Sequence, residues 1–338
     1  FYRTRLTHSL ETAQIGSGIC SHLKSDPFNN AYLEWIPCNY LIEAICLGHD
    51  LGHPAFGHGG ELAINSVMRL HGGFEGNGQT LRIVSRLGEF SPNHGLDLSR
   101  RTMLGLLKYP ALHRDVEKYP VPISENSTNI DHCEPPKCIH DDEEDVLNWI
   151  ISIFSVSDKE LFRTLEHKEK EHSKTVYKSL DASIMELADD IAYGVHDLED
   201  VITLELVKSK QWDEHVIEKI CEPCKSHSDL PEEFLAKGLF HGSKRDRKHS
   251  ISKLVNYFID STKIVEINSA ECPLLRLNAV MEDRAKSRLK ILKKFVKDQV
   301  IFTPQVQGLE FKGRQMIIRL FEVLQDNPKR LLTISDRK

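Results

Sequence analysis

The chain has 338 residues, of which 40% are hydrophobic and 28% charged, and this composition is typical of a soluble globular protein. Its formal net charge of −6 gives no global electrostatic case for a dedicated nucleic-acid binder. No run approaches the roughly 20 apolar residues that a membrane helix needs, and no secretory signal is visible. We therefore expect a cytoplasmic protein without membrane contact. Because the chain starts with Phe rather than Met, we also expect a natural N-terminus upstream.

Helical periodicity dominates the sequence. The predicted helices cover residues 7–23, 39–52, 60–72, 78–90, 97–110, 143–154, 179–206, 231–240, 249–261, 273–302 and 311–325. Asp97 is the expected N-cap of the fifth helix, and Pro110 the residue that stops it. Short strands are expected at most near 263–267 and 300–310. The pattern predicts an all-α, mostly helical fold with at most a few short strands.

The segment 110–142 is rich in Pro, Asn and Asp and has little periodicity. Such a long loop is either functional, as a lid or an inter-subunit arm, or a mobile surface insertion, and both interpretations stand. We expect a catalytic core over 1–206 that includes this loop. A C-terminal helical region over 207–338 is expected to pack on the core, giving one continuous domain.

Two further features leave alternatives open. Residues 284–297 (RAKSRLKILKKFVK) predict a basic amphipathic helix, which is either a solvated charged face or a phosphate or polynucleotide contact. The cysteines in CEPPKC (133–138) and CEPC (221–224) would together supply four zinc ligands. Because neither pair recurs with zinc-ribbon spacing, we favour reduced cytosolic thiols.

The stretch LGHDLGHPAFGHGGE, residues 47–61, combines histidines and acids with several glycines. It is too polar for a core and too irregular for a plain helix. His49 and Asp50 end a predicted apolar helix, where Gly48 and Gly52 are expected to leave space for both side chains to reach one metal ion. An imidazole and a carboxylate suit a divalent first-row metal, or Mg²⁺ or Mn²⁺. Two ligands do not make a site, so further ligands must come from elsewhere in the chain.

Two distant segments offer such ligands. His8 lies in RTRLTHSLE, beside two arginines, which is an unusual setting for a core histidine. In ELADDIAYGVHDLED, the side chains of Asp189, Tyr193 and Asp197 share one helix face because they are spaced four residues apart. Taken alone, that stripe would be a solvated acidic face, and only its combination with the histidine segments favours a site.

The order His8, His49-Asp50, Asp189 resembles the metal site of the HD-domain phosphohydrolase superfamily. Five motifs narrow the resemblance to the deoxyguanosine triphosphate triphosphohydrolase branch, and they extend over most of the chain. They read RTRLTHSLE, GHDLGHPAFGHGGE, GGFEGNGQTLRI, ELADDIAYGVHDLED and FKGRQMIIRLFEVLQDNP. A bare His-Asp dipeptide is weak evidence, whereas five motifs in the same order are strong evidence.

The resemblance implies an HD-domain fold and the hydrolysis of deoxynucleoside triphosphates, with dGTP expected first, to deoxynucleoside and inorganic triphosphate. It implies a divalent metal ion, Mg²⁺ or Mn²⁺ with other first-row metals open. The implied metal ligands are His8, His49, Asp50 and Asp189. The implied catalytic pair is His58 and Glu61, which are three residues apart and so would share one helical turn.

The resemblance also implies substrate contacts. Arg5 corresponds to a phosphate-binding arginine, Tyr193 to the residue packed near the sugar, and Asp197 to the residue that binds the 3′-hydroxyl. A tyrosine against C2′ would leave no room for a ribose hydroxyl. His53 is either a further phosphate or supporting contact or a loop histidine without a role. The polar residues of FEGNGQTLR (74–82), Glu75 and Asn77, are expected to line the same cleft.

Partners follow from the resemblance as well: a homo-oligomer, with a hexamer expected first, and a nucleotide or single-stranded DNA effector. Two alternatives remain. One is another HD phosphohydrolase, such as a nucleotidase or a cyclic-nucleotide phosphodiesterase. The other is a protein that senses nucleotides or nucleic acid on a catalytically inactive HD scaffold. The presence of all four ligand positions and the His58–Glu61 pair argues against the second.

Overall fold

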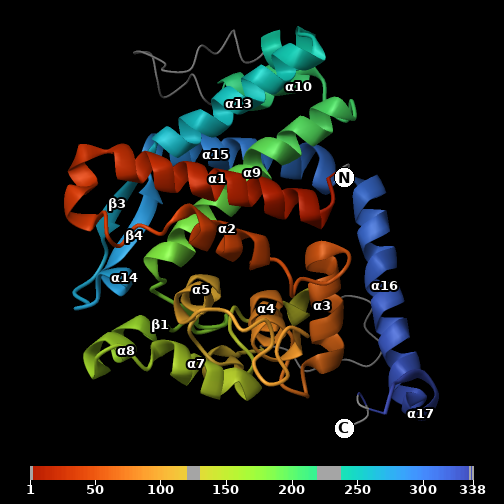
Figure 1. Ribbon diagram of the computed structural model, residues 1–338. Coiled ribbons are helices and arrows are strands. Elements are labelled where there is room, and N and C mark those ends of the chain that lie inside the picture. Colours follow the sequence, from red (N-terminus) through yellow and green to blue (C-terminus); the bar gives the residue numbers. More distant parts are fainter. Residues whose placement is uncertain (1–2, 120–129, 219–236, 335, 337–338) are drawn as a thin grey trace. The chain divides into compact units, whose positions relative to one another are not determined.

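The fold is described from a computed structural model of the chain. The structure describes residues 3–119, 130–218, 237–334 and 336. These residues are mostly helical and include only two antiparallel pairs of short strands (Figure 1). The prediction of an all-α fold with a few short strands is therefore confirmed. Among the described helices, none is both long and apolar enough to cross a membrane.

The chain divides into two compact units, and each combines segments that are far apart in sequence. Unit 1 contains Phe1–His49, Ser99–Leu106 and Lys178–Thr303. Unit 2 contains Asp50–Leu98, Leu107–Tyr177 and Pro304–Lys338. The predicted boundary at residue 206, and the packing of 207–338 on a core, stay predictions.

Unit 1 is built around the long helix α9 (Leu180–Thr203) (Figure 1). Ser179 caps it, since its hydroxyl accepts a hydrogen bond from the Ala182 amide at 3.2 Å. Apolar side chains on several sides of α9 are fully buried because other helices and one strand pack around it. These elements are α1 (Arg5–Ser25), α2 (Asn39–Gly48), α5 (Arg100–Leu106), α13 (Lys244–Asp260), α14 (Pro273–Arg276), α15 (Asp283–Val296) and β4 (Leu277–Met281).

Strand β4 pairs antiparallel with β3 (Thr262–Glu266), with Ile264 opposite Ala279. Short turns complete unit 1: η1 (Pro27–Tyr32), α10 (Ser209–Trp212), η5 (Asp213–Ile217), η6 (Lys237–His241) and η7 (Lys297–Ile301).

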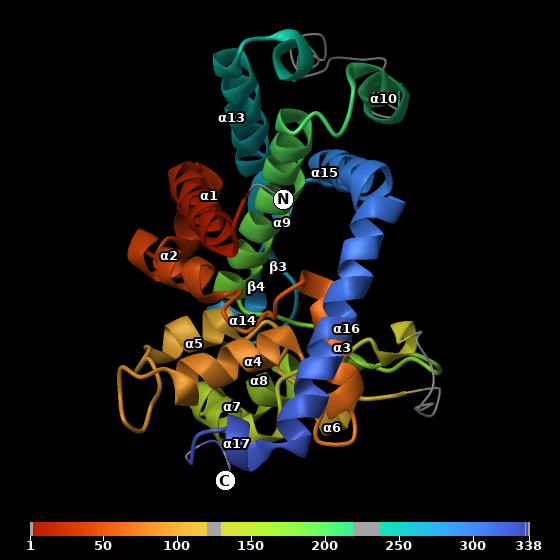
Figure 2. The same cartoon turned by 90° about the vertical axis from the view of Figure 1, so that its right-hand side faces the viewer.

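Unit 2 contains a helix pair, α3 (Gly57–Met68) and α16 (Pro304–Asp326), which lie side by side (Figure 2). Ile317 and Ile318 of α16 pack on a small buried cluster that includes Leu62 and Ala63 of α3. The other elements of unit 2 are α4 (Gly76–Arg82), η2 (Ile83–Leu87), α6 (His113–Val116), η3 (Asp131–Cys133), η4 (Asp141–Glu143), α7 (Glu144–Ile151), α8 (Val156–Phe162), β1 (Leu165–Glu166), β2 (Lys174–Thr175) and α17 (Pro328–Leu331). Strands β1 and β2 pair antiparallel.

Several predicted elements differ from the structure. The strand near 263–267 is confirmed as β3. The predicted helix 273–302 is interrupted after α14 by the strand β4, because pairing with β3 and burial against α9 override the helical pattern of residues 277–281. The strand near 300–310 is wrong, since these residues form the end of η7 and the start of α16. Asp97 is no helix cap. It has a left-handed φ of 53°, and α5 begins only at Arg100. The predicted helix 231–240 lies mostly outside the described residues.

The segment 110–142 is largely core where it is described. Leu112 and Ile139 form a parallel β-bridge, and both are buried together with Val116 and Cys138. The surface-insertion interpretation is therefore wrong for residues 110–113 and 135–140, which lie in or next to the core, whereas several residues between them are exposed. Cys133 and Cys138 are buried free thiols, whereas the cysteines of CEPC lie outside the described residues.

Candidate metal and catalytic site

The first candidate ligand, His8, is the fourth residue of α1. The hydroxyl of Thr4 caps that helix by accepting a hydrogen bond from the Thr7 amide. Because α1 packs on α9, His8 Nε2 comes to 3.1 Å from Asp189 Oδ1. Two residues that are distant in the sequence therefore meet within unit 1.

His49 lies at the C-terminal end of α2 and is only 5% exposed. Its Nδ1 is 2.6 Å from the carbonyl oxygen of Cys46, so Nδ1 donates its proton there and Nε2 is the acceptor nitrogen. Nε2 lies 3.6 Å from Asp189 Oδ1. The ligand atoms of His8 and His49 are within 4.8 Å of each other. A histidine whose second nitrogen is fixed by a carbonyl is the usual form of a metal ligand.

Asp50 follows His49 directly and is the first residue of unit 2. Its Oδ1 lies 3.2 Å from Nδ1 of His53, one turn further along. The expectation that Gly52 leaves open space for ligands is wrong. A Cβ at Gly52 would lie 2.1 Å from the Thr80 backbone nitrogen, so this glycine permits close approach to α4. The Gly52 amide donates to the Thr80 hydroxyl there at 2.9 Å.

His58 and Glu61 lie in the first turns of α3, as the spacing predicts. The helix follows Phe56, whose φ of 64° is unusual for a bulky residue. The side chain of His58 is 59% exposed, whereas that of Glu61 is 4% exposed, and His58 Nδ1 lies 3.6 Å from Glu61 Oε2. A buried carboxylate behind an exposed imidazole is suited to orient that imidazole for proton transfer.

The other oxygen of Glu61 is held by two donors. The Gly76 amide donates to Oε1 at 2.9 Å, and Lys137 Nζ lies 3.5 Å from the same atom. Burial raises the pKa of Glu61, but the interaction with His58, the charge of Lys137 and the Gly76 amide together lower it to about 2. Glu61 is therefore ionised at neutral pH.

The loop before α4 supports this carboxylate. Glu75 is fully buried and caps α4, accepting hydrogen bonds from the Gly78 amide at 2.8 Å and the Asn77 side chain at 2.7 Å. Glu75 thus binds the Asn77 side chain and the backbone of the first turn of α4. A Cβ at Gly76 would lie 2.8 Å from the His53 ring, so His53 packs on the residue whose amide holds Glu61. That contact gives His53 a supporting position.

The acidic face of α9 is half-buried rather than solvated. Burial raises the pKa of Tyr193 to about 12, and Lys293 of α15 lies 5.3 Å from the centre of its ring. Burial also raises the pKa of Asp197 to about 6, against the opposing effect of His8. Arg5 is exposed at the start of α1. Arg5, Tyr193 and Asp197 all belong to unit 1. Their contacts with a substrate stay predictions.

Sequence reasoning missed two residues that support the candidate site. Arg3 binds Glu11 at 2.7 Å and also pairs with Glu199 and the buried Asp200, which ties the start of α1 to α9. Lys137 lies 3.5 Å from Glu61 and 3.0 Å from Glu75 in unit 2. Neither residue belongs to a spacing pattern, because each finds its partners only after distant segments pack together.

Several basic side chains of helix α15 are bound to other residues of unit 1. Lys293 pairs with Asp190, Lys294 pairs with Asp298, and the buried Arg288 donates to the hydroxyl of Tyr257. These contacts favour the interpretation of a structural and solvated face over that of a polynucleotide contact.

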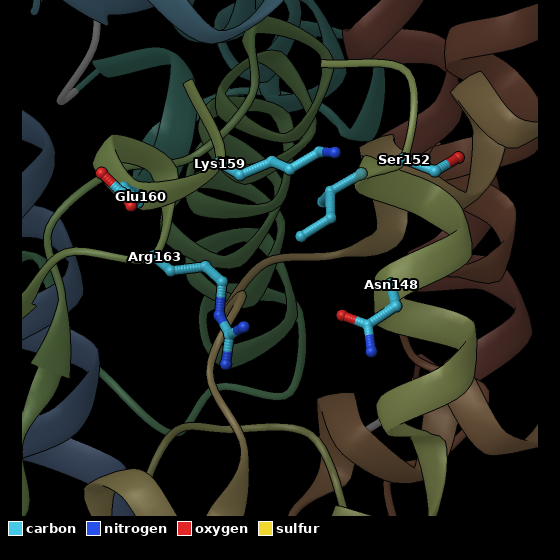
Figure 3. A pocket seen from close by; sticks show the side chains of 6 residues that line it. Asn148, Ser152, Lys159, Glu160 and Arg163 are labelled. Carbon is cyan, nitrogen blue, oxygen red and sulfur yellow. The ribbon is translucent and has the colours of Figure 1, made fainter. Parts of the chain in front are cut away.

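A pocket of about 500 Å³ lies in unit 2 and is lined from α7, α8 and the residues that follow them (Figure 3). Lys159 and Arg163 extend into it opposite Asn148 (Figure 3). None of its lining residues is among the predicted site residues.

Comparison with known proteins identifies the class. Residues 5–92 match the family model of the HD domain, and residues 279–337 match that of the phosphohydrolase-associated domain. The first match contains His8, the His49-Asp50 pair and the His58–Glu61 pair. The chain is thus an HD-domain phosphohydrolase.

Proteins with similar sequences identify the family more closely. Proteins from Aliivibrio fischeri and Vibrio parahaemolyticus are each 44% identical over the whole of this chain and 78% of their own length. A protein from Shewanella pealeana is 45% identical over the whole chain and 77% of its own length. All three are described as deoxyguanosinetriphosphate triphosphohydrolase-like proteins. The chain belongs to this family, which confirms the resemblance seen in the sequence, and it is a hydrolase.

Proposed function

We propose that the protein hydrolyses deoxynucleoside triphosphates, dGTP first, to deoxynucleoside and inorganic triphosphate. The similarity to triphosphohydrolase-like relatives over the whole chain supports this substrate class. The observation that carries the proposal is the convergence of His8, His49 and Asp189 in unit 1, since two imidazoles and a carboxylate meet where a cation could be held.

The donor set fits a divalent ion. His49 presents Nε2 because its Nδ1 donates to a carbonyl, and Asp189 adds a hard oxygen ligand. Asp50, the next residue after His49, would be the fourth ligand. Mixed nitrogen and oxygen ligands suit Mn²⁺ or another first-row ion, with Mg²⁺ the alternative. When bound, the ion would offset the negative charge of the triphosphate and polarise its phosphorus–oxygen bonds.

His58 and Glu61 would handle the proton. Ionised Glu61, whose Oε2 lies 3.6 Å from His58 Nδ1, would orient the ring by accepting a hydrogen bond from the Nδ1–H group, which leaves Nε2 as the base for an attacking water. The water oxygen bonds to the α-phosphorus, the bond from that phosphorus to the 5′-oxygen breaks, and the 5′-oxygen takes up a proton. Arg5 would bind phosphate, Tyr193 would pack near the sugar, and Asp197 would accept a hydrogen bond from the 3′-hydroxyl. His53 would support the site through Gly76, with a direct phosphate contact as the alternative.

We also propose that the protein is a homo-oligomer, a hexamer first, which responds to a nucleotide or single-stranded DNA effector. Sedimentation at several protein concentrations, with and without each effector, tests this part separately from the chemistry. A monomer at all concentrations contradicts it. The cytoplasmic location stays a prediction.

A substrate panel tests the function. The four deoxynucleoside triphosphates are incubated with Mn²⁺ or Mg²⁺, with and without single-stranded DNA, and the products are separated by ion chromatography. Inorganic triphosphate is the expected product. Pyrophosphate or a monophosphate instead favours another HD phosphohydrolase, and tight nucleotide binding without turnover favours a sensing protein.

A further inference from the structure

Lys137 lies between two buried carboxylates of unit 2. Its Nζ is 3.0 Å from Glu75 Oε1 and 3.5 Å from Glu61 Oε1. The side chains of Glu75 and Glu61 are 0% and 4% exposed. A buried carboxylate is unfavourable unless it is paired with a positive charge. The ammonium group of Lys137 therefore stabilises both carboxylates in their ionised form.

The two carboxylates have different partners. Glu75 is fixed by the Gly78 amide and the Asn77 side chain as well as by Lys137, so it provides a rigid anchor for the ammonium. The contacts of Glu61 are divided between its oxygens. Oε1 takes the Gly76 amide and Lys137, while Oε2 faces Nδ1 of His58.

We propose that Lys137 is a positioning residue: anchored on Glu75, it fixes one oxygen of Glu61 so that the other faces His58. This inference rests on the proposed function, in which His58 and Glu61 handle the proton. Lys137 acts through Glu61 and contacts no reacting atom. The segment 130–142, for which the sequence left a functional interpretation open beside that of a surface insertion, would thereby support the catalytic pair.

The arrangement has a pH consequence of definite sign. The positive charge of Lys137 helps to lower the pKa of Glu61. Without that charge the pKa of Glu61 rises, so Glu61 becomes protonated at a higher pH and stops orienting His58. Loss of Lys137 should therefore lower kcat more at low pH than at high pH.

The test compares kcat, KM and their pH dependence for wild type and K137M with dGTP and Mn²⁺. We expect kcat to fall about 10–100-fold, the range found when a supporting contact is removed. KM should change by less than about threefold, because substrate contacts remain. The deficit should grow as the pH falls, and K137R, which keeps the charge, should restore part of kcat and the wild-type pH profile.

A matched control is R314M. Arg314 is a buried cation of unit 2, paired with Asp131 and Glu310, and among the described residues it forms no ion pair with Glu61. R314M should keep the wild-type pH profile even if its melting temperature falls. A folded K137M with unchanged kcat overturns the inference. A loss that is equal at every pH and not rescued by K137R also overturns it and leaves only a structural role.

A second readout works without turnover. The carboxyl carbons of glutamate are labelled with ¹³C, the Glu61 resonance is assigned by its absence in E61Q, and its titration is followed in wild type and K137M. If K137M does not fold, K137Q replaces it. A Glu61 titration that does not move to higher pH overturns the inference about Lys137, even in an active enzyme. Absence of triphosphate release by wild type instead contradicts the proposed function alone.

Discussion

The two histidine groups of this protein are built in opposite ways. His8, His49 and Asp189 come from three helices of unit 1 and meet only because α1, α2 and α9 pack together. His58 and Glu61 come from one helical turn of unit 2 and would be neighbours in an isolated helix. The first group depends on tertiary packing for its geometry, and the second depends on it only for support.

The histidines of the two groups also differ in their exposure to solvent. His49 is buried and its tautomer is fixed by a carbonyl, as a ligand requires. His58 is mostly exposed and can exchange protons, with its buried partner Glu61 behind it. Perturbing each group in turn should therefore give different signatures, namely loss of metal binding in one case and loss of proton transfer in the other.

The largest effect is expected for H49A. Because His49 is a proposed metal ligand, its loss should abolish the charge compensation that a bound cation would provide, which amounts to several kcal/mol or on the order of 10³-fold in kcat/KM. Titration calorimetry should show weaker Mn²⁺ binding in parallel. H71A, which changes an exposed histidine of the turn after α3, is the control and should bind Mn²⁺ like wild type. Normal Mn²⁺ affinity in H49A contradicts the assignment.

H58A should lower kcat by about 10²–10³-fold, as expected when a general base is lost, while Mn²⁺ affinity stays close to that of wild type. Single-turnover kinetics measures the chemical step directly. An unchanged rate of that step in H58A would remove His58 from the mechanism. E61Q keeps the shape of the side chain but not its charge, and should give a similar but smaller loss.

G76A should have a moderate effect through the Glu61 carboxylate. The added Cβ would meet the His53 ring at 2.8 Å, so either the ring or the start of α4 must shift, and the Gly76 amide that holds Glu61 moves with the helix. We expect kcat to fall about tenfold and the unfolding free energy by about 1–3 kcal/mol. G308A, at a glycine with open space around its Cβ position, is the matched control and should leave kcat unchanged. Wild-type kcat in G76A contradicts the supporting role of the loop.

The smallest effect on catalysis is expected for R3M, which acts on α1. Loss of Arg3 leaves the buried Asp200 without its guanidinium partner, which should lower the unfolding free energy by about 1–3 kcal/mol. Urea denaturation measures this change. K24M, at the other end of α1, removes only a hydrogen bond to a backbone carbonyl and should be milder. If R3M and wild type are equally stable, the ion pairs of Arg3 contribute nothing to the stability of unit 1.

The sequence predicted what local periodicity and motif order encode. The approximate positions of α1 to α5, α7 and α9, the His58–Glu61 pair and the alignment of Asp189 with Tyr193 all follow from 3.6-residue spacing, whereas the short helices α6 and α8 were not predicted. The meeting of His8 with Asp189 came from a family resemblance, because no local pattern relates residues so far apart.

What the sequence did not predict depends on tertiary packing. The strand β4 has the apolar pattern of a helix and becomes a strand because β3 pairs with it. Lys137 looks like an ordinary surface lysine until segment 130–142 packs beside α4 and gives it two carboxylates. The sequence suggested that Gly52 leaves space for metal ligands, whereas in the structure its missing side chain allows close contact with the α4 backbone.

The central claim is that water attacks the α-phosphorus of a deoxynucleoside triphosphate and that the whole triphosphate leaves. Hydrolysis of dGTP in H₂¹⁸O, with mass spectrometry of both products, tests it most directly. Attack at the α-phosphorus should place one ¹⁸O atom in inorganic triphosphate and none in deoxyguanosine. Release of pyrophosphate with deoxyguanosine monophosphate, or ¹⁸O in deoxyguanosine, would contradict it.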